Sequence, residues 1–379
     1  MIAPQPAGEP LRVLWLTSRP GTPSSVQPDL ELARQLARAA IDVHIIAPAD
    51  SCFAQAARQA GLTVVGYPPR GLLGRVGRQH VRSYCRAQDI QLVHLLDAFA
   101  TVAVLPALSD APVPVVARHA RVGGVQRWNP MARLTVLHPR LDRVICTSEA
   151  ARMALARRRS PASVTTIRPG YDLDWYDERP ADLARLGIPA DAFAIAVATD
   201  YRGRMGIEYI VDAAQWLPLD SRAHFLLIGA GHENRSVLER ISRSPLRERF
   251  HLLGPRFDAP RITAACAVSV RAALRGDDVP QAIMAAMACG VTPLMTDTGA
   301  AQELVEQGES GVIVPRRSAR AIGEALAWLC AHPAACRTMG LAARARIAGG
   351  FSLAHAVALH QALYRELCAS GRTQPGDRL

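Results

Sequence analysis

The sequence predicts an α/β protein made of two doubly wound domains, each a parallel sheet with helices on both faces. Short apolar stretches alternate with longer stretches of helix-forming residues along the chain, which is the pattern of strands joined by crossover helices. The chain opens in the order strand, loop, helix, strand, and the alternation starts again at residues 194–198. Its 379 residues also suit two domains of ordinary size. The expected divisions are residues 1–170, residues 171–350, and a C-terminal helix and tail over residues 351–379.

Each expected strand of the first domain is a short apolar run. The first, over residues 12–17, leads into a loop over residues 18–28 and a helix over residues 29–40. Further strands are expected over residues 42–47, 63–66, 92–95, 113–117 and 143–147. Pro169 and Gly170 mark the hinge between the domains. In the second domain we expect strands over 194–198, 224–228 and 250–253, and helices over 207–216, 236–242, 318–347 and 351–368.

Residues 275–315 give the clearest local prediction. Pro280 suits the first turn of a helix, because its missing N–H would have no intrahelical partner there. Residues 282–289 are rich in helix formers, and Gly290 is placed to end the helix. A strand over 291–295, a loop at Gly299, a short helix over 302–306 and a strand over 312–315 follow. A polar loop before a helix N-terminus, repeated at two strand ends, predicts an anion site built from backbone N–H groups and the helix dipole.

Composition excludes several classes of protein. The chain is 49% hydrophobic and 20% charged, so it can bury sizeable cores. No apolar run reaches the roughly 18 residues that span a bilayer, and the N-terminus lacks a signal-peptide pattern. The eight cysteines form no C-x-x-C pair and no cluster with histidines, which argues for reduced thiols and against a structural zinc site. We therefore expect a cytoplasmic protein with no metal and no other cofactor.

Charge is distributed unevenly, and all of the basic charge is arginine. The sequence contains no lysine, which excludes a Walker-type phosphate lysine and Schiff-base chemistry. Residues 1–170 hold 21 arginines against 10 acidic residues, a balance of +11, whereas residues 171–379 hold 23 of each. Two interpretations remain open: the first domain meets an anionic membrane surface or phosphorylated acceptor, or it has a solvated basic face. The same choice applies to the basic stretch over residues 69–82. Nucleic acid is not expected, since no recognition motif accompanies the charge.

The block over residues 275–315 resembles the donor-site motif of GT-B glycosyltransferases of the family 4 type. That motif has the form E-G-x-P-x-x-x-x-E-A-M-A-x-G-x-P-V, followed by G-G-x-x-E and G-x-x-G. The matching residues are Pro280, Ala286, Met287, Ala288, Gly290, Gly299, Glu303, Gly308 and Gly311. Asp277 stands at the first glutamate and Asp278 at the glycine, while Ala285 replaces the second glutamate. Residues 172–176, Asp-Leu-Asp-Trp-Tyr, further resemble bacterial members that act on envelope saccharides.

The resemblance implies an architecture and an activity. The architecture is GT-B: two Rossmann-like domains facing a central cleft, with C-terminal helices packing back on the N-terminal domain. The implied activity is transfer of a sugar, with retention and without a metal, from a nucleotide-sugar donor on the second domain. The acceptor, a saccharide or a lipid-linked saccharide, would bind the first domain. Such enzymes make bacterial lipopolysaccharide, capsule or exopolysaccharide, and this one would act in the cytoplasm or at the inner face of the membrane.

The resemblance also assigns residues. His119 and Asp277 would be the catalytic residues, although a lone histidine at a strand end can equally be structural. Ser24 and Ser25, in the first loop, stand where the family often has glycines against the donor phosphate; a loop without contact is the alternative. Arg118 and Arg121 would face the acceptor. The implied donor-binding residues are Arg202, Arg204, Gly254, Arg256, Asp278, Val279, Pro280, Gln281, Gly299 and Glu303.

Two departures from the family motif leave a second function open. Ala285 removes a carboxylate that would bind the donor ribose, and Met205 replaces a lysine that would bind the diphosphate. A charge-assisted hydrogen bond contributes about 1.5–3 kcal/mol, so losing both would cost roughly 3–6 kcal/mol of donor binding. Arg202 and Arg204 could replace the lysine, and Asp278 a carboxylate. The alternative is a degenerate, non-catalytic GT-B protein that binds a saccharide or a partner glycosyltransferase.

Overall fold

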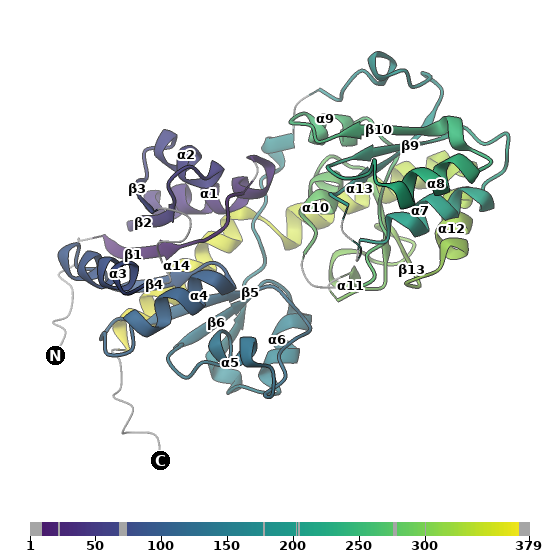
Figure 1. The fold of residues 1–379 in the computed structure, drawn as a ribbon. Helices are drawn as coiled ribbons and strands as arrows, with labels where there is room; N and C mark the ends of the chain where they lie inside the picture. The colour runs from purple at the N-terminus through teal and green to yellow at the C-terminus, as the bar shows by residue number, and fades with distance from the viewer. Residues whose placement is uncertain are drawn as a thin grey trace. The chain divides into compact units, whose positions relative to one another are not determined.

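The computed structural model describes residues 10–21, 23–67, 74–176, 179–201, 203, 205–275, 279–299 and 301–370. The chain divides into two compact units. Unit 1 comprises Met1–Gly170 and Leu353–Leu379, and unit 2 comprises Tyr171–Ser352. Each unit contains one parallel sheet covered by helices (Figure 1). The predicted α/β class, with two doubly wound sheets, is therefore confirmed.

The sheet of unit 1 has seven parallel strands in the order β3-β2-β1-β4-β5-β6-β7. The strands are β1 Leu11–Leu16, β2 Ile41–Pro48, β3 Thr63–Tyr67, β4 Leu92–Leu95, β5 Val115–His119, β6 Arg143–Cys146 and β7 Val164–Thr166. The order reverses between β1 and β4, so the loops after these two strands diverge at the carboxyl edge of the sheet. A ligand of a doubly wound domain binds at this position.

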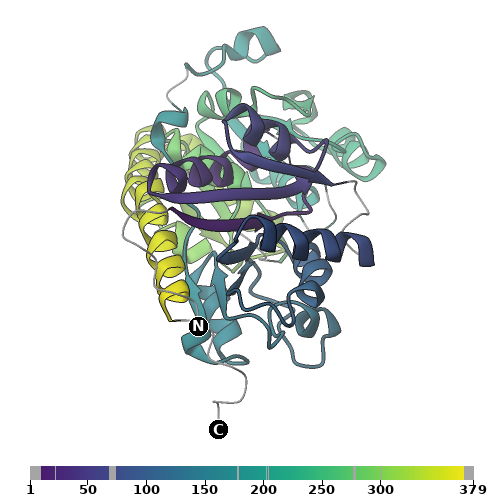
Figure 2. The same ribbon diagram turned by 90° about the vertical axis from the view of Figure 1, so that its left-hand side faces the viewer.

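Among the described residues, the α-helices of unit 1 are α1 Pro23–Arg38, α2 Cys52–Gln59, α3 Arg75–Ala87, α4 Ala98–Val104, α5 Pro130–Leu134, α6 Glu149–Ala156 and α14 Leu353–Ala369. Leu14 and Leu16 of β1 share a core with α3, α4 and α6. Trp15, between them, points to the opposite face, where its indole N–H donates to the Tyr364 hydroxyl of α14 (3.2 Å). The yellow helix α14 runs along this unit in Figures 1 and 2, and it packs against α1 and β4.

The first helix begins earlier than the sequence predicts. The loop expected over residues 18–28 is wrong, because α1 starts at Pro23 and holds Pro28 inside it. A proline in a helix interior removes one N–H bond, which is why Pro28 suggests a helix start. Here the first turn precedes it, and Pro23 occupies the first position, where the missing N–H leaves no bond unmade. Ser24 and Ser25 thus lie in the first turn of a helix, and their side chains are outside the description.

The sheet of unit 2 has six parallel strands in the order β10-β9-β8-β11-β12-β13, with its reversal between β8 and β11. The strands are β8 Phe193–Ala198, β9 Ala223–Ile228, β10 Phe250–Gly254, β11 Val268–Arg271, β12 Thr292–Thr296 and β13 Val312–Val314. The helices are α7 Ile207–Ala213, α8 Arg235–Arg243, α9 Ala259–Ala264, α10 Gln281–Ala288, α11 Ala301–Leu304, α12 Ala319–Ala331 and α13 Pro333–Gly350.

The two faces of this second sheet carry different helices. Ile195 and Val197 of β8 share a core with α7, α8 and α12. Ala194 and Ala196 point to the other face, where they pack with Ile262 of α9. Helix α10 packs against α13 and against Met295 of β12. Within the described ranges, no helix combines the length and the apolar character that crossing a membrane requires.

Candidate functional site

The loops after β8 and β11 touch at the reversal of the second sheet. Gly206, which caps the start of α7, has φ 69°. A Cβ built on it would lie 2.0 Å from the carbonyl oxygen of Ala272, directly after β11. No side chain fits there, and the left-handed φ independently favours glycine. Gly206 therefore holds the two loops that flank the expected ligand position in direct contact.

The loop after β9 packs against the same edge. A Cβ on Gly229, which has φ 141°, would lie 2.3 Å from the carbonyl oxygen of Thr199. The Asp200 carboxylate accepts a hydrogen bond from the Ala230 N–H at 3.0 Å. The loops after three neighbouring strands of the sheet, β9, β8 and β11, thus form one continuous rim at its carboxyl edge.

Helix α10 starts at the same rim. Pro280 takes its N-cap position in an extended conformation (φ −76°, ψ 109°). It makes no side-chain capping bond with the described residues. Val279 is buried and Gln281 is the exposed first residue of the helix. The first turn of a helix carries a partial positive charge, so this arrangement favours an anion at the rim.

The other predicted donor-site residues that the structure describes lie near β12, in α11 and near β10. Gly299 (φ 42°) follows β12, and a Thr296 hydroxyl bond to the Ala273 carbonyl (2.7 Å) ties that strand end to the loop after β11. Glu303 lies in α11, where its backbone carbonyl accepts from Arg346. Gly254 ends the edge strand β10. Nearby Arg256 already makes a two-bond ion pair with Asp258 (2.7 and 2.8 Å).

Four predicted site residues lie outside the described ranges: Arg202, Arg204, Asp277 and Asp278. Met205, at the position where the family has lysine, packs against the hydrophobic core of unit 2. This position therefore supplies no cation to the rim.

In unit 1, His119 ends β5 and is buried, with 7% of its surface exposed. Burial, and secondarily the positive charge of Arg121, lower the pKa of this histidine from 6.5 to about 4. Its ring is consequently neutral near pH 7. A backbone hydrogen bond with Arg121 engages the ring, and Nε2 has no partner among the residues described. His119 can therefore exchange one hydrogen bond with a ligand without carrying charge.

Arg118 and His119 do not form one cluster. Successive side chains of a strand point to opposite faces, and the Arg118 guanidinium lies with Asp29 of α1 at 2.5 Å. Its Nε also donates to the Leu96 carbonyl (3.1 Å). Arg118 and His119 therefore lie on opposite faces of β5. Arg121, beyond the strand end, is exposed.

Arg118 lines a cavity of about 30 Å³ at the reversal of the first sheet. Its polar lining includes Asp29, His94, Thr147, Arg168 and His360. Nε2 of His94 and the Thr147 hydroxyl, both buried, find no partner among the described residues. A cavity of this size holds one or two water molecules, which would satisfy such groups.

Beside the cavity, a buried chain of polar groups joins three elements. The Tyr364 hydroxyl accepts from Trp15 and contacts Nδ1 of His94 at 2.7 Å. The hydroxyl, which accepts a hydrogen bond from Trp15, still has its own proton to donate to Nδ1 of neutral His94. Burial lowers the pKa of His94 well below 6.5 and that of His360 to about 4. These buried polar side chains are therefore uncharged near neutral pH.

One residue of this edge was not predicted from the sequence. Asp97 directly follows β4 and is buried. Its carboxylate accepts from the backbone N–H and hydroxyl of Ser18 (2.6 Å each) and from the Thr17 hydroxyl (3.0 Å). It also caps α4 by accepting from the Ala100 N–H (2.9 Å). An acidic residue directly after a buried strand was the available indication. Asp97 fixes the loop after β1 at the reversal of the sheet.

No group of three or more histidine, cysteine or acidic side chains within the described ranges is arranged to hold a metal ion. The described rim of unit 2 instead supplies backbone groups, glycine turns and a helix start. Such a rim suits an anionic ligand whose charge is met by dipoles and arginine.

Comparison with known proteins identifies both halves of the chain. Residues 30–175 match the family model "Glycosyltransferase Family 4", and residues 193–332 match "Glycosyl transferases group 1". D-inositol 3-phosphate glycosyltransferase 1 of Catenulispora acidiphila is 27% identical over 80% of this chain and 72% of its own length. WcaL of Salmonella typhimurium, named as a colanic acid biosynthesis glycosyltransferase, is 25% identical over 44% of this chain. That match spans only 42% of the Salmonella protein.

Solved structures share the fold. HepE of Anabaena in complex with UDP superposes with a TM-score of 0.81 at 20% identity, over 94% of this chain and 100% of that one. Its complex with UDP-glucose gives 0.80 at 20% identity, over 95% and 100%. The apo lipopolysaccharide outer core galactosyltransferase WaaB gives 0.72 at 9% identity, over 94% and 100%. The chain therefore has the GT-B fold and belongs to the group 1 and family 4 glycosyltransferases.

Proposed function

We propose that this glycosyltransferase transfers a sugar, with retention and without a metal ion, from a nucleotide-sugar to a saccharide or lipid-linked acceptor in bacterial surface-glycan synthesis. The observation that carries the proposal is the rim of unit 2. There Gly206 packs on Ala272 at the reversal of the sheet, beside the start of α10. A diphosphate at this point would meet backbone N–H groups and the positive end of a helix.

The relatives support the donor and glycan classes. HepE is described in complex with UDP and UDP-glucose, WcaL is named for colanic acid and WaaB for lipopolysaccharide. We propose the same chemistry for this chain: the departing diphosphate is stabilised by fixed dipoles and by arginine rather than by a metal. Such stabilisation is usually the largest electrostatic contribution to catalysis. His119, neutral and with Nε2 available, would bond a hydroxyl of the transferred sugar. Asp277 would be the carboxylate on the donor side.

The test is thermal unfolding of the full chain in the presence of UDP-, GDP-, ADP- and TDP-sugars, with the free nucleotides as controls. A ligand at 100 times its dissociation constant adds about 2.7 kcal/mol to the free energy of unfolding. We expect one donor class to raise the unfolding temperature. Stabilisation by no donor at millimolar concentration would contradict the proposal.

The donor found in this way would then be used in transfer assays. We expect transfer to continue when divalent cations are chelated, and the product to keep the donor's anomeric configuration by NMR. Loss of activity on chelation would contradict the metal-independent mechanism, and an inverted product would contradict retention.

Met205 and Ala285 favour a second candidate function. Met205 packs into the core, and Ala285 of α10 has no carboxylate for a ribose. A non-catalytic protein that binds a saccharide or a partner glycosyltransferase would show saccharide stabilisation without donor stabilisation. The thermal unfolding panel therefore includes saccharides alone.

A further inference from the structure

The carboxyl end of β5 is tied to three other elements of unit 1. The Arg118 guanidinium pairs with the Asp29 carboxylate of α1 at 2.5 Å. Arg118 Nε also donates to the Leu96 carbonyl, directly after β4, at 3.1 Å. On the other side of the strand, the His119 carbonyl accepts from the Thr147 N–H, directly after β6, at 3.0 Å. Residues 118 and 119 are thus connected to α1 and to the chain after both neighbouring strands.

The ion pair between Arg118 and Asp29 is largely withdrawn from solvent. The two side chains are 19% and 25% exposed, so salt screens their attraction less than that of a surface pair. The planar guanidinium meets a carboxylate and a carbonyl at once, which leaves it little freedom to turn. Because the pair joins residues 89 positions apart, it fixes α1 against β5 instead of stabilising a single helix.

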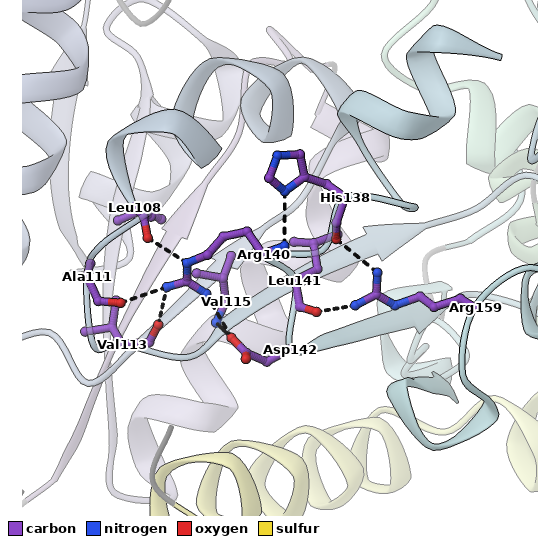
Figure 3. A network of polar contacts seen from close by, with 9 residues as sticks. All are labelled: Leu108, Ala111, Val113, Val115, His138, Arg140, Leu141, Asp142 and Arg159. Atoms are coloured by element: carbon purple, nitrogen blue, oxygen red, sulfur yellow. Dashed lines mark hydrogen bonds and ion pairs between the residues drawn. The ribbon is translucent and has the colours of Figure 1, made fainter. Parts of the chain in front are cut away.

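A second arginine fixes the opposite end of β5 (Figure 3). Arg140 is buried, and it donates to the carbonyls of Leu108, Ala111 and Val113. It also pairs with Asp142 at 3.0 Å, and the Asp142 carboxylate accepts from the N–H of Val115, the first residue of β5, at 2.8 Å. The amino end of the strand is therefore held in place, and the position of its last residue depends on the contacts at the carboxyl end.

His119 is that last residue, so these contacts set where its ring lies. The ring is engaged by a backbone hydrogen bond with Arg121, and Nε2 has no partner among the described residues. A hydrogen bond weakens steeply as its angle departs from linear, and a displacement of about 1 Å can lower a reaction rate on the order of 100-fold. The available nitrogen of His119 is therefore useful to a ligand only while the strand end is held.

We propose that Arg118 and Asp29 are positioning residues that hold His119 in the orientation needed for sugar transfer. Neither side chain has to touch the reacting atoms, because Arg118 acts through the backbone that it shares with His119. The inference rests on the proposed function, since it takes His119 as the residue that bonds the transferred sugar. It gives Arg118 a different role from the direct acceptor contact that the family resemblance implies.

The test is steady-state kinetics of the full chain, with the donor found by thermal unfolding and a saccharide acceptor. Arg118→Met keeps the aliphatic stem and removes both contacts of the guanidinium. We expect it to lower kcat/KM roughly two- to tenfold, mainly through kcat, because one neutral hydrogen bond is worth no more than that. In a His119→Ala background we expect no further loss from Arg118→Met, because the residue that Arg118 positions is then absent.

Three other variants grade the effect. Arg118→Lys can pair with Asp29 but lacks the fork that also reaches Leu96, so it should recover part of the lost activity. Asp29→Ala should lose less activity than Arg118→Met, because the bond to Leu96 remains. Arg34→Met is the matched control: Arg34 pairs at 2.7 Å with Glu31 of the same helix, and its loss should leave the kinetics unchanged.

A measurement without substrate separates positioning from charge. NMR titration follows the His119 ring, whose pKa is held at about 4 mainly by burial, and its signal is identified by its absence in His119→Ala. Asp29→Ala removes a negative charge, which by itself would lower the pKa of a nearby histidine. We expect the opposite, a rise toward 6.5, because a loosened strand end admits water to the ring. Thermal unfolding of each variant checks that it folds.

Three results would overturn the proposal. Equal fractional losses for Arg118→Met with and without His119 would mean a general loss of structure. A raised acceptor KM that persists in the His119→Ala background would assign Arg118 to direct acceptor binding. Full activity of Arg118→Met would reject the positioning role and leave the transferase function intact. A wild-type chain that transfers no sugar would instead reject the proposed function, and the positioning role with it.

Discussion

Gly206 shows how a single residue shapes the donor rim. Its φ of 69° and the 2.0 Å approach to the Ala272 carbonyl leave no room for a side chain. Alanine at a positive φ destabilises by about 1 kcal/mol through the backbone alone. The clash would add to this by separating the loops after β8 and β11. Both the backbone conformation of residue 206 and the neighbouring Ala272 carbonyl therefore require glycine at this position.

We predict that Gly206→Ala reduces donor affinity at least tenfold, measured by titration calorimetry with the donor that stabilises the wild type. Gly203→Ala is the matched control. It lies in the same loop, and an added Cβ would meet no described atom within 4 Å. Equal loss in both variants would mean that the effect is not specific to the Ala272 contact. Unchanged donor affinity in both variants would mean that the donor does not bind at this rim.

The imidazole ring of His119 is uncharged near neutral pH. With the pKa lowered to about 4, the ring carries no charge over the usual assay range. One neutral hydrogen bond contributes about 0.5–1.5 kcal/mol, so His119→Ala should lower kcat/KM roughly two- to tenfold. His119→Gln, which keeps a donor and an acceptor, should lose less. The wild-type pH profile should show no inflection near 6.5 from this residue. An inflection there that disappears in His119→Gln would contradict a neutral role.

At the scale of the elements, Asp97 joins the loop after β1 to the start of α4. Its carboxylate accepts four hydrogen bonds, two of them from Ser18. Bonds to a charged acceptor are worth about 1.5–3 kcal/mol, and an amide cannot accept from all of these donors at once. We therefore predict that Asp97→Asn lowers the free energy of unfolding by about 2 kcal/mol, measured in urea.

The control for Asp97 is Asp89→Asn. Asp89 is 82% exposed and pairs with Arg12 at 3.4 Å, a type of contact that contributes about 0–1 kcal/mol. Equal destabilisation by the two substitutions would contradict a special role for Asp97.

Most strands were predicted, because apolar runs and glycine turns are local features, but β7 and β11 were not predicted. The start of α10 at Pro280 and the turn at Gly290 (φ 76°) follow from such local rules. The start of α1 was missed because Pro28 resembles a helix boundary, whereas packing of α1 against β2 and α14 maintains the helix around it.

The sequence does not predict the partners of site residues where those partners are distant in the chain. Arg118 and His119 are neighbours in sequence, but strand alternation sends Arg118 to Asp29, 89 residues away. Asp97 bonds Ser18 across 79 residues, which no local pattern reveals. The contact of Gly206 with the Ala272 carbonyl likewise joins residues that are distant in the sequence.

For the whole molecule, the buried histidines of unit 1 link stability to pH. His119 and His360 have pKa values lowered from 6.5 to about 4, mainly by burial. Above pH 6.5 both rings are neutral in the folded and the unfolded chain, so they add no pH dependence. Between pH 6.5 and 4 the unfolded chain binds protons that the folded chain does not. Stability therefore falls as the pH falls through this window.

Each pKa unit corresponds to about 1.4 kcal/mol, so each of the two histidines should lower the free energy of unfolding by about 3 kcal/mol once the pH is below 4. Together they remove much of the roughly 5–15 kcal/mol that stabilises a typical domain. We predict a steep loss of stability between pH 6.5 and 4 in urea unfolding followed by circular dichroism. His360→Gln should flatten part of that loss, because glutamine does not titrate, even if its stability at pH 7 is lower. A wild-type curve that is flat across this window would mean that the two rings are protonated in the folded chain, and that unit 1 opens to water around them.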